Sequence, residues 1–181
     1  MRIRPVKSFE KIDELLGRTS DPDHRAMLEN FKAHMTAEIA CDIEGIMATM
    51  TPHPVYHSYS GRTSDEVVHV NGREQNRAMY QGIFDEGSSV LQLDIERLSV
   101  ADWGIAGDGV IRIINPGKVL ASRGIDVDDE DAFYLVSNRI AWFLPYDHGL
   151  MGGEDTYVDP ATTEIVKLDS SEVVTPAEAF A

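Results

Sequence analysis

The sequence predicts an α+β fold in which a strongly bent, mostly antiparallel sheet wraps around a long helix as a cone-shaped barrel, with the helices N-terminal. Helical patterns fill the chain up to about residue 50, and strand patterns separated by turn residues dominate after Ser88. One further helical pattern lies between two short strand patterns. Helices followed by a meander of strands are typical of α+β proteins rather than of a doubly wound parallel sheet.

Three helices are expected before the first strand. The first begins at Ser8, a good N-cap residue, and ends at a glycine. The second is the long one, because Asp21 can cap it, Pro22 suits its first position, and its pattern continues to about residue 41. A short third helix covers residues 42–50.

The rest of the chain is expected to be mainly sheet. We predict strands at residues 55–59, 66–70, 90–100, 133–144, 150–158 and 165–168, a hairpin over 103–114 that turns at Asp108-Gly109, and a helix at 73–84. Pro116-Gly117 predicts a further turn, and the acidic segment 126–131 predicts a solvated loop. We expect one domain over residues 1–168, followed by an acidic tail, 169–181, that is mobile or packed on a neighbouring surface.

Composition restricts the class of partner. The chain has 181 residues, the size of one domain, and a formal net charge of −15. Such acidity argues against nucleic acid or an anionic membrane as the partner, because both would repel the protein; a cationic partner is the lesser alternative to a simple role in solubility. Cys41 is the single cysteine, which fits a reducing compartment. We expect no secretory signal, because no apolar stretch follows the charged first residues, and no membrane-spanning segment, because no apolar run is long enough. We therefore expect a cytoplasmic protein.

Two polar residues interrupt the apolar face of the long helix. On a helical wheel that face consists of Met27, Leu28, Phe31, Met35 and Ile39. Glu38 falls near its centre and His34 on its edge, four residues apart and within reach of each other. A carboxylate in a core is costly unless it is paired or faces a cavity. Glu38 is accordingly a candidate general base with a raised pKa, beside His34; the alternative is a structural carboxylate bonded to the backbone or to a tyrosine.

The strand at 55–59 carries proton donors on both of its faces. Alternation places Tyr56 with Ser58 on one face and His57 with Tyr59 on the other. The sequence does not decide which face meets the cavity. Either His57 with Tyr59, as catalytic groups, or Tyr56, as a substrate-binding group, is expected there, and ordinary core packing is the competing interpretation.

Other candidates for the cavity wall come from the helix at 73–84 and from the sheet. They are Tyr80 and Asn76 on the helix, Trp103 and Trp142 as walls for an aromatic ligand, and Glu154, one of two adjacent acidic residues of which one must point inward. For each of them a role in the core is the alternative.

No motif for a metal or a cofactor is present. The chain has no HExxH and no paired cysteines, and His53 and His57 are too far apart on one extended strand to share a metal directly. The glycines at 104–109 open no helix, so a phosphate-binding loop is not expected either. We expect a site that uses neither metal nor cofactor.

Three motifs resemble the SnoaL-like branch of the nuclear transport factor 2-like superfamily. They are His34-x-x-x-Glu38-x-x-x-Asp42 with the residues that follow to Met50, Asn71-Gly72-Arg73-Glu74 with the later Tyr80, and residues 153–159. The resemblance covers about residues 21–168. It implies a cone-shaped fold that hosts ketosteroid isomerase, scytalone dehydratase, limonene epoxide hydrolase, polyketide cyclases, lyases that release formaldehyde from lignin-derived diarylpropanes, and members that only bind or dock partners.

The resemblance also implies where the pocket lies. His34 matches the position at which ketosteroid isomerase has its oxyanion-hole tyrosine, and His57 or Ser58 matches the position of its general-base aspartate. Neither position has the isomerase's residue, so the resemblance implies the pocket and not steroid isomerisation. Family members form dimers or trimers through the sheet, so a homodimer or homotrimer is expected.

The resulting hypothesis is a cofactor-independent lyase that removes water or formaldehyde from an apolar, aromatic, hydroxylated small molecule such as a lignin-derived diarylpropane diol. Glu38 would be the general base, oriented by His34, with His57, Tyr59 or Tyr56 as the proton donor. The alternatives are an isomerase or cyclase that uses the same pocket and a non-catalytic binding or scaffold domain.

Overall fold

The computed structural model describes residues 2–60 and 67–180. Its helices are η1 (Pro5–Phe9), α1 (Glu10–Arg18), α2 (Pro22–Ile39), α3 (Ile43–Ala48), α4 (Gly72–Asp85), α5 (Gly117–Ser122) and η3 (Pro176–Glu178). Its strands are β1 (Met50–Tyr59), β2 (Val67–Asn71), β3 (Leu91–Ala101), β4 (Gly104–Pro116), β5 (Phe133–Asp147) and β6 (Leu150–Lys167). In the described part of the chain, no helix is long and apolar enough to cross a membrane.

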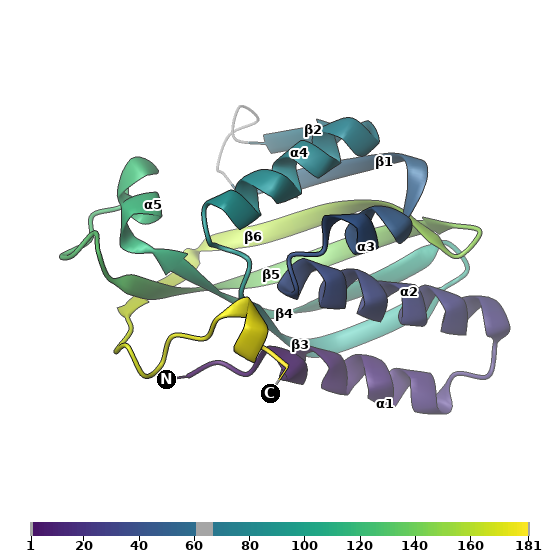
Figure 1. Ribbon diagram of the computed structural model, residues 1–181. Helices are drawn as coiled ribbons and strands as arrows, with labels where there is room; N and C mark the ends of the chain where they lie inside the picture. Colours follow the sequence, from purple (N-terminus) through teal and green to yellow (C-terminus); the bar gives the residue numbers. More distant parts are fainter. Residues whose placement is uncertain (1, 61–66, 181) are drawn as a thin grey trace.

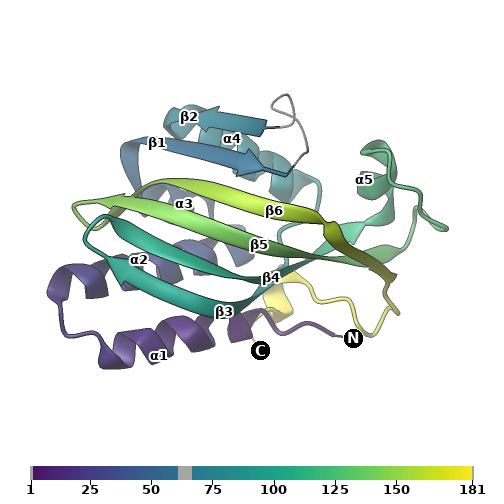
Figure 2. The ribbon, with the colours of Figure 1, turned by 180° about the vertical axis from the view of Figure 1, so that it is seen from behind.

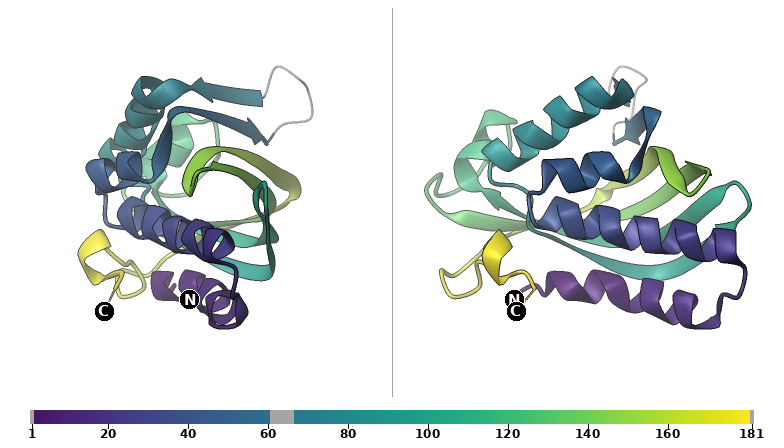
Figure 3. Two further views of the ribbon diagram at one scale, coloured as in Figure 1. Left: turned by 90° about the vertical axis from the view of Figure 1, so that its right-hand side faces the viewer. Right: turned by 45° about the vertical axis from the view of Figure 1, so that its right-hand side comes forward.

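The six strands form one strongly bent sheet in the order β2-β1-β6-β5-β4-β3. Neighbouring strands are antiparallel except β1 and β6, which are parallel. Helices α2, α3 and α4 lie on the concave side, and α1 runs beside α2 (Figure 1). Figure 2 shows the strands in front of these helices, and Figure 3 shows the sheet curving around α2. The predicted α+β cone is confirmed, but within the described residues the sheet is open, with β2 and β3 at its edges, rather than a closed barrel.

The long helix begins where the sequence predicts. The Asp21 side chain accepts hydrogen bonds from the backbone N–H groups of Asp23 and His24, and Pro22 occupies the first helical position. The helix ends at Ile39, slightly earlier than predicted, because Cys41 adopts a left-handed conformation with φ of 56°. Asp42 then caps α3 through the backbone N–H of Gly45, as expected.

Two predicted boundaries near the sheet edge are wrong. The first α-helix begins at Glu10, not Ser8, and Ser8 lies buried in η1, where its hydroxyl accepts a hydrogen bond from the Leu93 N–H. The Pro116-Gly117 pair starts the short helix α5 rather than an isolated turn. The predicted strand 66–70 corresponds to β2, except for residue 66, which lies outside the described residues.

The predicted hairpin at Asp108-Gly109 is also wrong. Strand β4 runs through both residues, and the chain reverses at residues 102–103 instead. Gly109 serves a close approach between strands: a Cβ there would lie 2.1 Å from the carbonyl oxygen of Asp94, next to a register shift between Ile95 and Arg97. The glycine therefore permits strand packing rather than a turn.

The acidic tail packs on its own domain. Val174 and Ala179 are buried and belong to the same apolar cluster as Ile3 and Phe9. The short helix η3 begins with a reciprocal cap between Thr175 and Glu178. An ion pair between Arg2 and Glu178 joins the C-terminal segment to the N-terminal one.

Candidate active site

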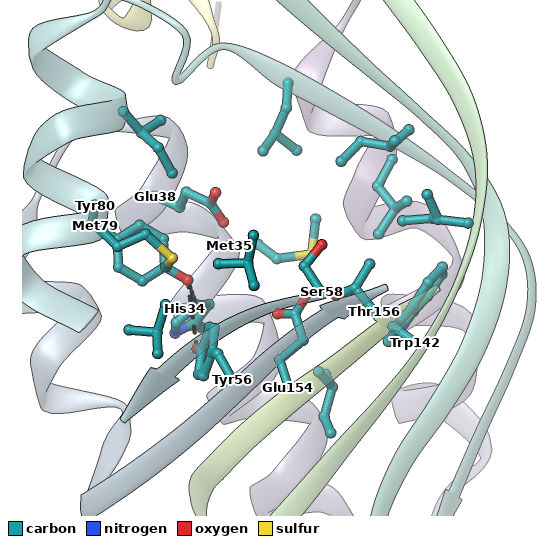
Figure 4. Close-up of a pocket in the computed structure, with 18 of the residues that line it drawn as sticks. His34, Met35, Glu38, Tyr56, Ser58, Met79, Tyr80, Trp142, Glu154 and Thr156 are labelled. Carbon is teal, nitrogen blue, oxygen red and sulfur yellow. Dashed lines mark hydrogen bonds between the residues drawn. The ribbon is translucent and has the colours of Figure 1, made fainter. Parts of the chain in front are cut away.

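A cavity of about 330 Å³ lies between α2, α4 and the concave face of the sheet. Its apolar walls are formed by Phe31, Met35, Val68, Val70, Met79, Ile83, Leu91, Leu93, Ile111, Ile113, Ile140, Trp142 and Leu144. Its polar groups are confined to the part where α2, α4, β1 and β6 meet, and most of them are labelled in Figure 4. An apolar pocket with a few convergent polar groups is the usual form of a small-molecule site.

Glu38 projects from α2 into this cavity (Figure 4). In the part of the chain that the structure describes, no group hydrogen-bonds its carboxylate and no Lys or Arg lines the cavity. The side chain is half-buried. Burial, with a smaller contribution from the charge of Glu154, raises the pKa of Glu38 from 4.5 to about 8.

Glu154 faces the same cavity from the sheet. Strand β6 pairs with β1 so that Glu154 lies beside Tyr56 and Thr156 beside Ser58, and alternation turns these four side chains to the concave side. The Thr156 hydroxyl donates a hydrogen bond to the Glu154 carboxylate. Burial raises the pKa of Glu154, the hydrogen bond from Thr156 opposes the rise, and the charge of Asp155 adds a smaller rise.

His34 is held by two partners other than Glu38. Its Nδ1 lies 2.7 Å from the Thr49 hydroxyl oxygen, and its Nε2 lies 3.0 Å from the Tyr80 hydroxyl oxygen. The Thr49 hydroxyl donates its one proton to the carbonyl of Ile46, so His34 must donate from Nδ1 and accept from Tyr80 at Nε2. Burial lowers the pKa of His34 to about 4, which agrees with a neutral ring. The expected contact between His34 and Glu38 is therefore not a hydrogen bond.

Tyr56, and not His57 with Tyr59, faces the cavity. Its hydroxyl oxygen lies 3.5 Å from that of Tyr80 and 3.3 Å from the sulfur of Met151. His57 only borders the cavity, because its Nδ1 lies 2.6 Å from the Asp155 carboxylate on the opposite face of the sheet. Tyr59 also lies on that face, where its ring stacks on Tyr157 at 4.6 Å between centroids.

Two further candidates lie away from the cavity. Asn76 is fully buried, and its amide nitrogen donates to the carbonyls of Gly72, at 2.9 Å, and Pro54, at 3.4 Å, so it ties α4 to β1. Trp103 sits at the β3–β4 turn with about half of its side chain exposed and contacts Phe143 on the outer face. Of the two tryptophans, only Trp142 lines the cavity, at 3% exposure.

The structure adds two residues that the sequence interpretation missed. Thr49 fixes the tautomer of His34, and Thr156 is the hydrogen-bond donor to Glu154. The position of Thr156 could have been predicted from the sequence, because it lies two residues after Glu154 and residues two apart on a strand share a face. Thr49 had none, because its contact with His34 depends on how α3 folds back against α2.

No protein-family model matches the chain, and no curated protein matches it by sequence. A protein from Shewanella denitrificans described as a SnoaL-like polyketide cyclase superposes with a TM-score of 0.58 at 15% identity, over 74% of this chain and 90% of that one. A nuclear transport factor 2-like protein from Anabaena variabilis superposes with a TM-score of 0.57 at 9% identity, over 80% and 96%.

The chain has the nuclear transport factor 2-like fold. An epoxide hydrolase from M. tuberculosis, described as similar to limonene epoxide hydrolase, shares the fold with a TM-score of 0.54 at 12% identity, over 78% of this chain and 88% of that one. The predicted SnoaL-like resemblance is therefore confirmed at the level of fold. The described residues contain no group of three or more His, Cys, Asp or Glu side chains that could hold a metal ion.

Proposed function

We propose that this chain is a cofactor-independent lyase that removes water or formaldehyde from an apolar, aromatic, hydroxylated small molecule. One observation carries the proposal: two carboxylates, Glu38 and Glu154, face one apolar cavity, and the structure gives a hydrogen-bond donor to only one of them. Pairs of acids whose surroundings separate their pKa values are the usual arrangement for acid/base catalysis.

The two carboxylates have different roles. The Thr156 hydroxyl stabilises ionised Glu154, whereas Glu38 has no such donor among the described residues. Glu154 therefore ionises before Glu38 and is the base, and Glu38, which keeps its proton up to about pH 8, is the acid. The sequence-based hypothesis that Glu38 is the base applies only above about pH 8, where Glu38 is ionised.

Both lyase reactions use this pair. In a dehydration, Glu154 takes a proton from carbon, the carbon–oxygen bond breaks, and Glu38 protonates the departing hydroxyl as water. In formaldehyde release, Glu154 takes the proton of a primary hydroxyl, the adjacent carbon–carbon bond breaks, and Glu38 protonates the carbon that is left. Each positioned acid or base contributes about 10²–10⁴-fold in rate. The Tyr56 hydroxyl is the nearby donor for a developing oxyanion.

The cavity sets the size of the substrate. Its volume of about 330 Å³ is roughly twice that of an engineered cavity of ~150 Å³ that holds benzene. A molecule with about two aromatic rings therefore fits. Trp142 and the rings of Tyr56 and Tyr80 provide flat walls for it.

The second candidate function is that of an isomerase or cyclase, because two structural neighbours are described as polyketide cyclases. The same acid and base would then move a proton from one substrate atom to another without a leaving group. The two candidates predict different products: a lyase releases water or formaldehyde, and an isomerase or cyclase conserves the mass of the substrate.

The test is a turnover screen in EDTA, without added cofactor, that follows products by mass. It uses aryl alcohols, diarylpropane diols and cyclic enones, with Glu38→Gln and Glu154→Gln as active-site variants. Glu29→Gln on α2 and Glu164→Gln on β6 are matched controls, because both residues are exposed. We expect turnover in the wild type and both controls and a loss of about 10²-fold or more in each active-site variant. Turnover that survives both active-site substitutions would contradict the proposal.

A further inference from the structure

The cavity has an unbalanced charge. Glu38 and Glu154 both face it, no Lys or Arg of the described chain lines it, and no described group donates a hydrogen bond to Glu38. Leaving a carboxylate unpaired among apolar walls is costly, and the cost is relieved either by protonation or by a cation. Glu154 has the Thr156 hydroxyl as a partner, so Glu38 is the carboxylate without one.

We propose that the cavity binds an aromatic ligand with a primary or secondary ammonium group, and that this group pairs with Glu38. The inference rests on the proposed function in using the same cavity, and it adds the charge of the ligand. The ammonium group would then act as the proton donor in place of the protonated Glu38 carboxyl. Glu154 would remain the base. A hydroxylated arylalkylamine would combine the leaving group with the cation.

The walls favour an ammonium ion over the other head groups. A neutral hydroxyl gives Glu38 one hydrogen bond, whereas an ammonium ion gives hydrogen bonds with charge, which are about twice as strong. The rings of Tyr56, Tyr80 and Trp142 line the same space, and aromatic faces attract cations. A ligand carboxylate would add a third negative group with no basic side chain to meet it. The net charge of −15 also concentrates cations around the protein and repels anions.

Ammonium binding must also move protons. The titratable groups of the cavity that contains Glu38 are His34 on its own helix, Tyr56 and His57 on β1, Tyr80 on α4 and Glu154 on β6, and the cavity residues of β3, β4 and β5 are apolar. In the empty cavity the pKa of Glu38 is about 8, so Glu38 is mostly protonated at pH 7. A cation beside Glu38 lowers this pKa, and binding therefore releases a proton.

The test is calorimetric titration at pH 7 with three probes that share one ring system: 1-naphthylmethylamine, 1-naphthalenemethanol and 1-naphthoate. We expect the amine to bind about tenfold more tightly than the alcohol, and the acid to bind more weakly than both. Titrations in buffers with different ionisation enthalpies should show that the amine releases up to one proton and that the alcohol releases none.

The variant Glu38→Gln separates charge pairing from general fit to the cavity. This variant should abolish the proton release, weaken amine binding about tenfold, and change the affinity for the alcohol by no more than about twofold. The control Glu29→Gln should change none of these quantities. The inference is overturned if the wild-type protein binds the amine no more tightly than the alcohol, or does not bind the amine at all. This holds whatever the variant does. If the alcohol still binds and turnover still depends on both carboxylates, the proposed function stands without this inference.

Discussion

Glu38 on α2 and Glu154 on β6 face one cavity from its helical wall and its sheet wall, and the charge of Glu154 adds to the rise in the Glu38 pKa. The first cause of that rise is burial, which disfavours the charged carboxylate. The fold produces this pair by bending the sheet around the helix, so that two acids far apart in sequence share one apolar space. The predictions below follow from this relationship and from the packing around it.

The stability of the protein should fall with pH because of Glu38. Its pKa is about 8 in the folded chain and close to 4.5 in an unfolded one, so between these values the folded state holds the extra proton. Stability is lost as the pH rises through this window. Glu38→Gln removes the effect and should be more stable than the wild type by about 2–4 kcal/mol at pH 8.5, with little difference at pH 5.

Urea unfolding at the two pH values measures this difference. Glu29→Gln, on the exposed side of α2, is the control and should follow the wild type at both. A Glu38→Gln variant that is less stable than the wild type at pH 8.5 would show that the carboxylate is structural, bonded to donors rather than unpaired.

His34 should remain neutral to about pH 4, with its proton on Nδ1. Nitrogen NMR of the labelled imidazole reports both the tautomer and the pKa. Tyr80→Phe removes the donor to Nε2 and should cost about 1–2 kcal/mol, because a buried acceptor is left unpaired. Tyr157→Phe, on the outer face, is the matched control and should cost less than about 0.5 kcal/mol. An Nε2-protonated ring would contradict the assignment.

Two glycine substitutions should have opposite effects. Gly109→Ala places a Cβ 2.1 Å from a backbone oxygen of β3, so it should cost about 2 kcal/mol or more. Gly82→Ala, in an exposed part of α4 with nothing within 4 Å, should stabilise by about 0.5–1 kcal/mol. Thermal unfolding of the two variants checks this, and a neutral Gly109→Ala would mean that β3 and β4 do not approach closely there.

With a neutral substrate such as an aryl alcohol, turnover should decline above about pH 8. Glu38 must hold its proton to act as the acid, and it loses that proton as the pH passes its pKa. The wild type should therefore show a falling limb near pH 8, and the residual activity of Glu38→Gln should lack it. A rate that rises through pH 8 would instead assign the base to Glu38.

The helical half of the fold and its polar residues were readable from the sequence. Asp21 and Pro22 determine where α2 begins. The helical wheel places Glu38 on an apolar face correctly, because the apolar residues of this long helix recur with the helical period and the same residues are buried. Alternation in the same way requires one of Glu154 and Asp155 to point inward. The α+β class followed from the order of these patterns.

The sheet was less readable, for physical reasons. Alternation separates Tyr56 from His57 but does not say which face is concave. The bending of the sheet around α2, which depends on contacts distant in sequence, decides it (Figure 3). Gly109 reads as a turn residue because turns and close strand contacts both require glycine, and only the partner strand distinguishes them. The link from His34 to Thr49 depends on tertiary packing as well.

The most direct test of the account is a carbon NMR titration of the glutamate carboxyl groups, with Glu38→Gln and Glu154→Gln used to assign the two resonances. We expect Glu38 to titrate near pH 8, after Glu154, and its pKa to fall when Glu154 is replaced. Titration of Glu38 near its ordinary value of 4.5 would contradict the account, because the cavity would then contain no protonated acid at neutral pH.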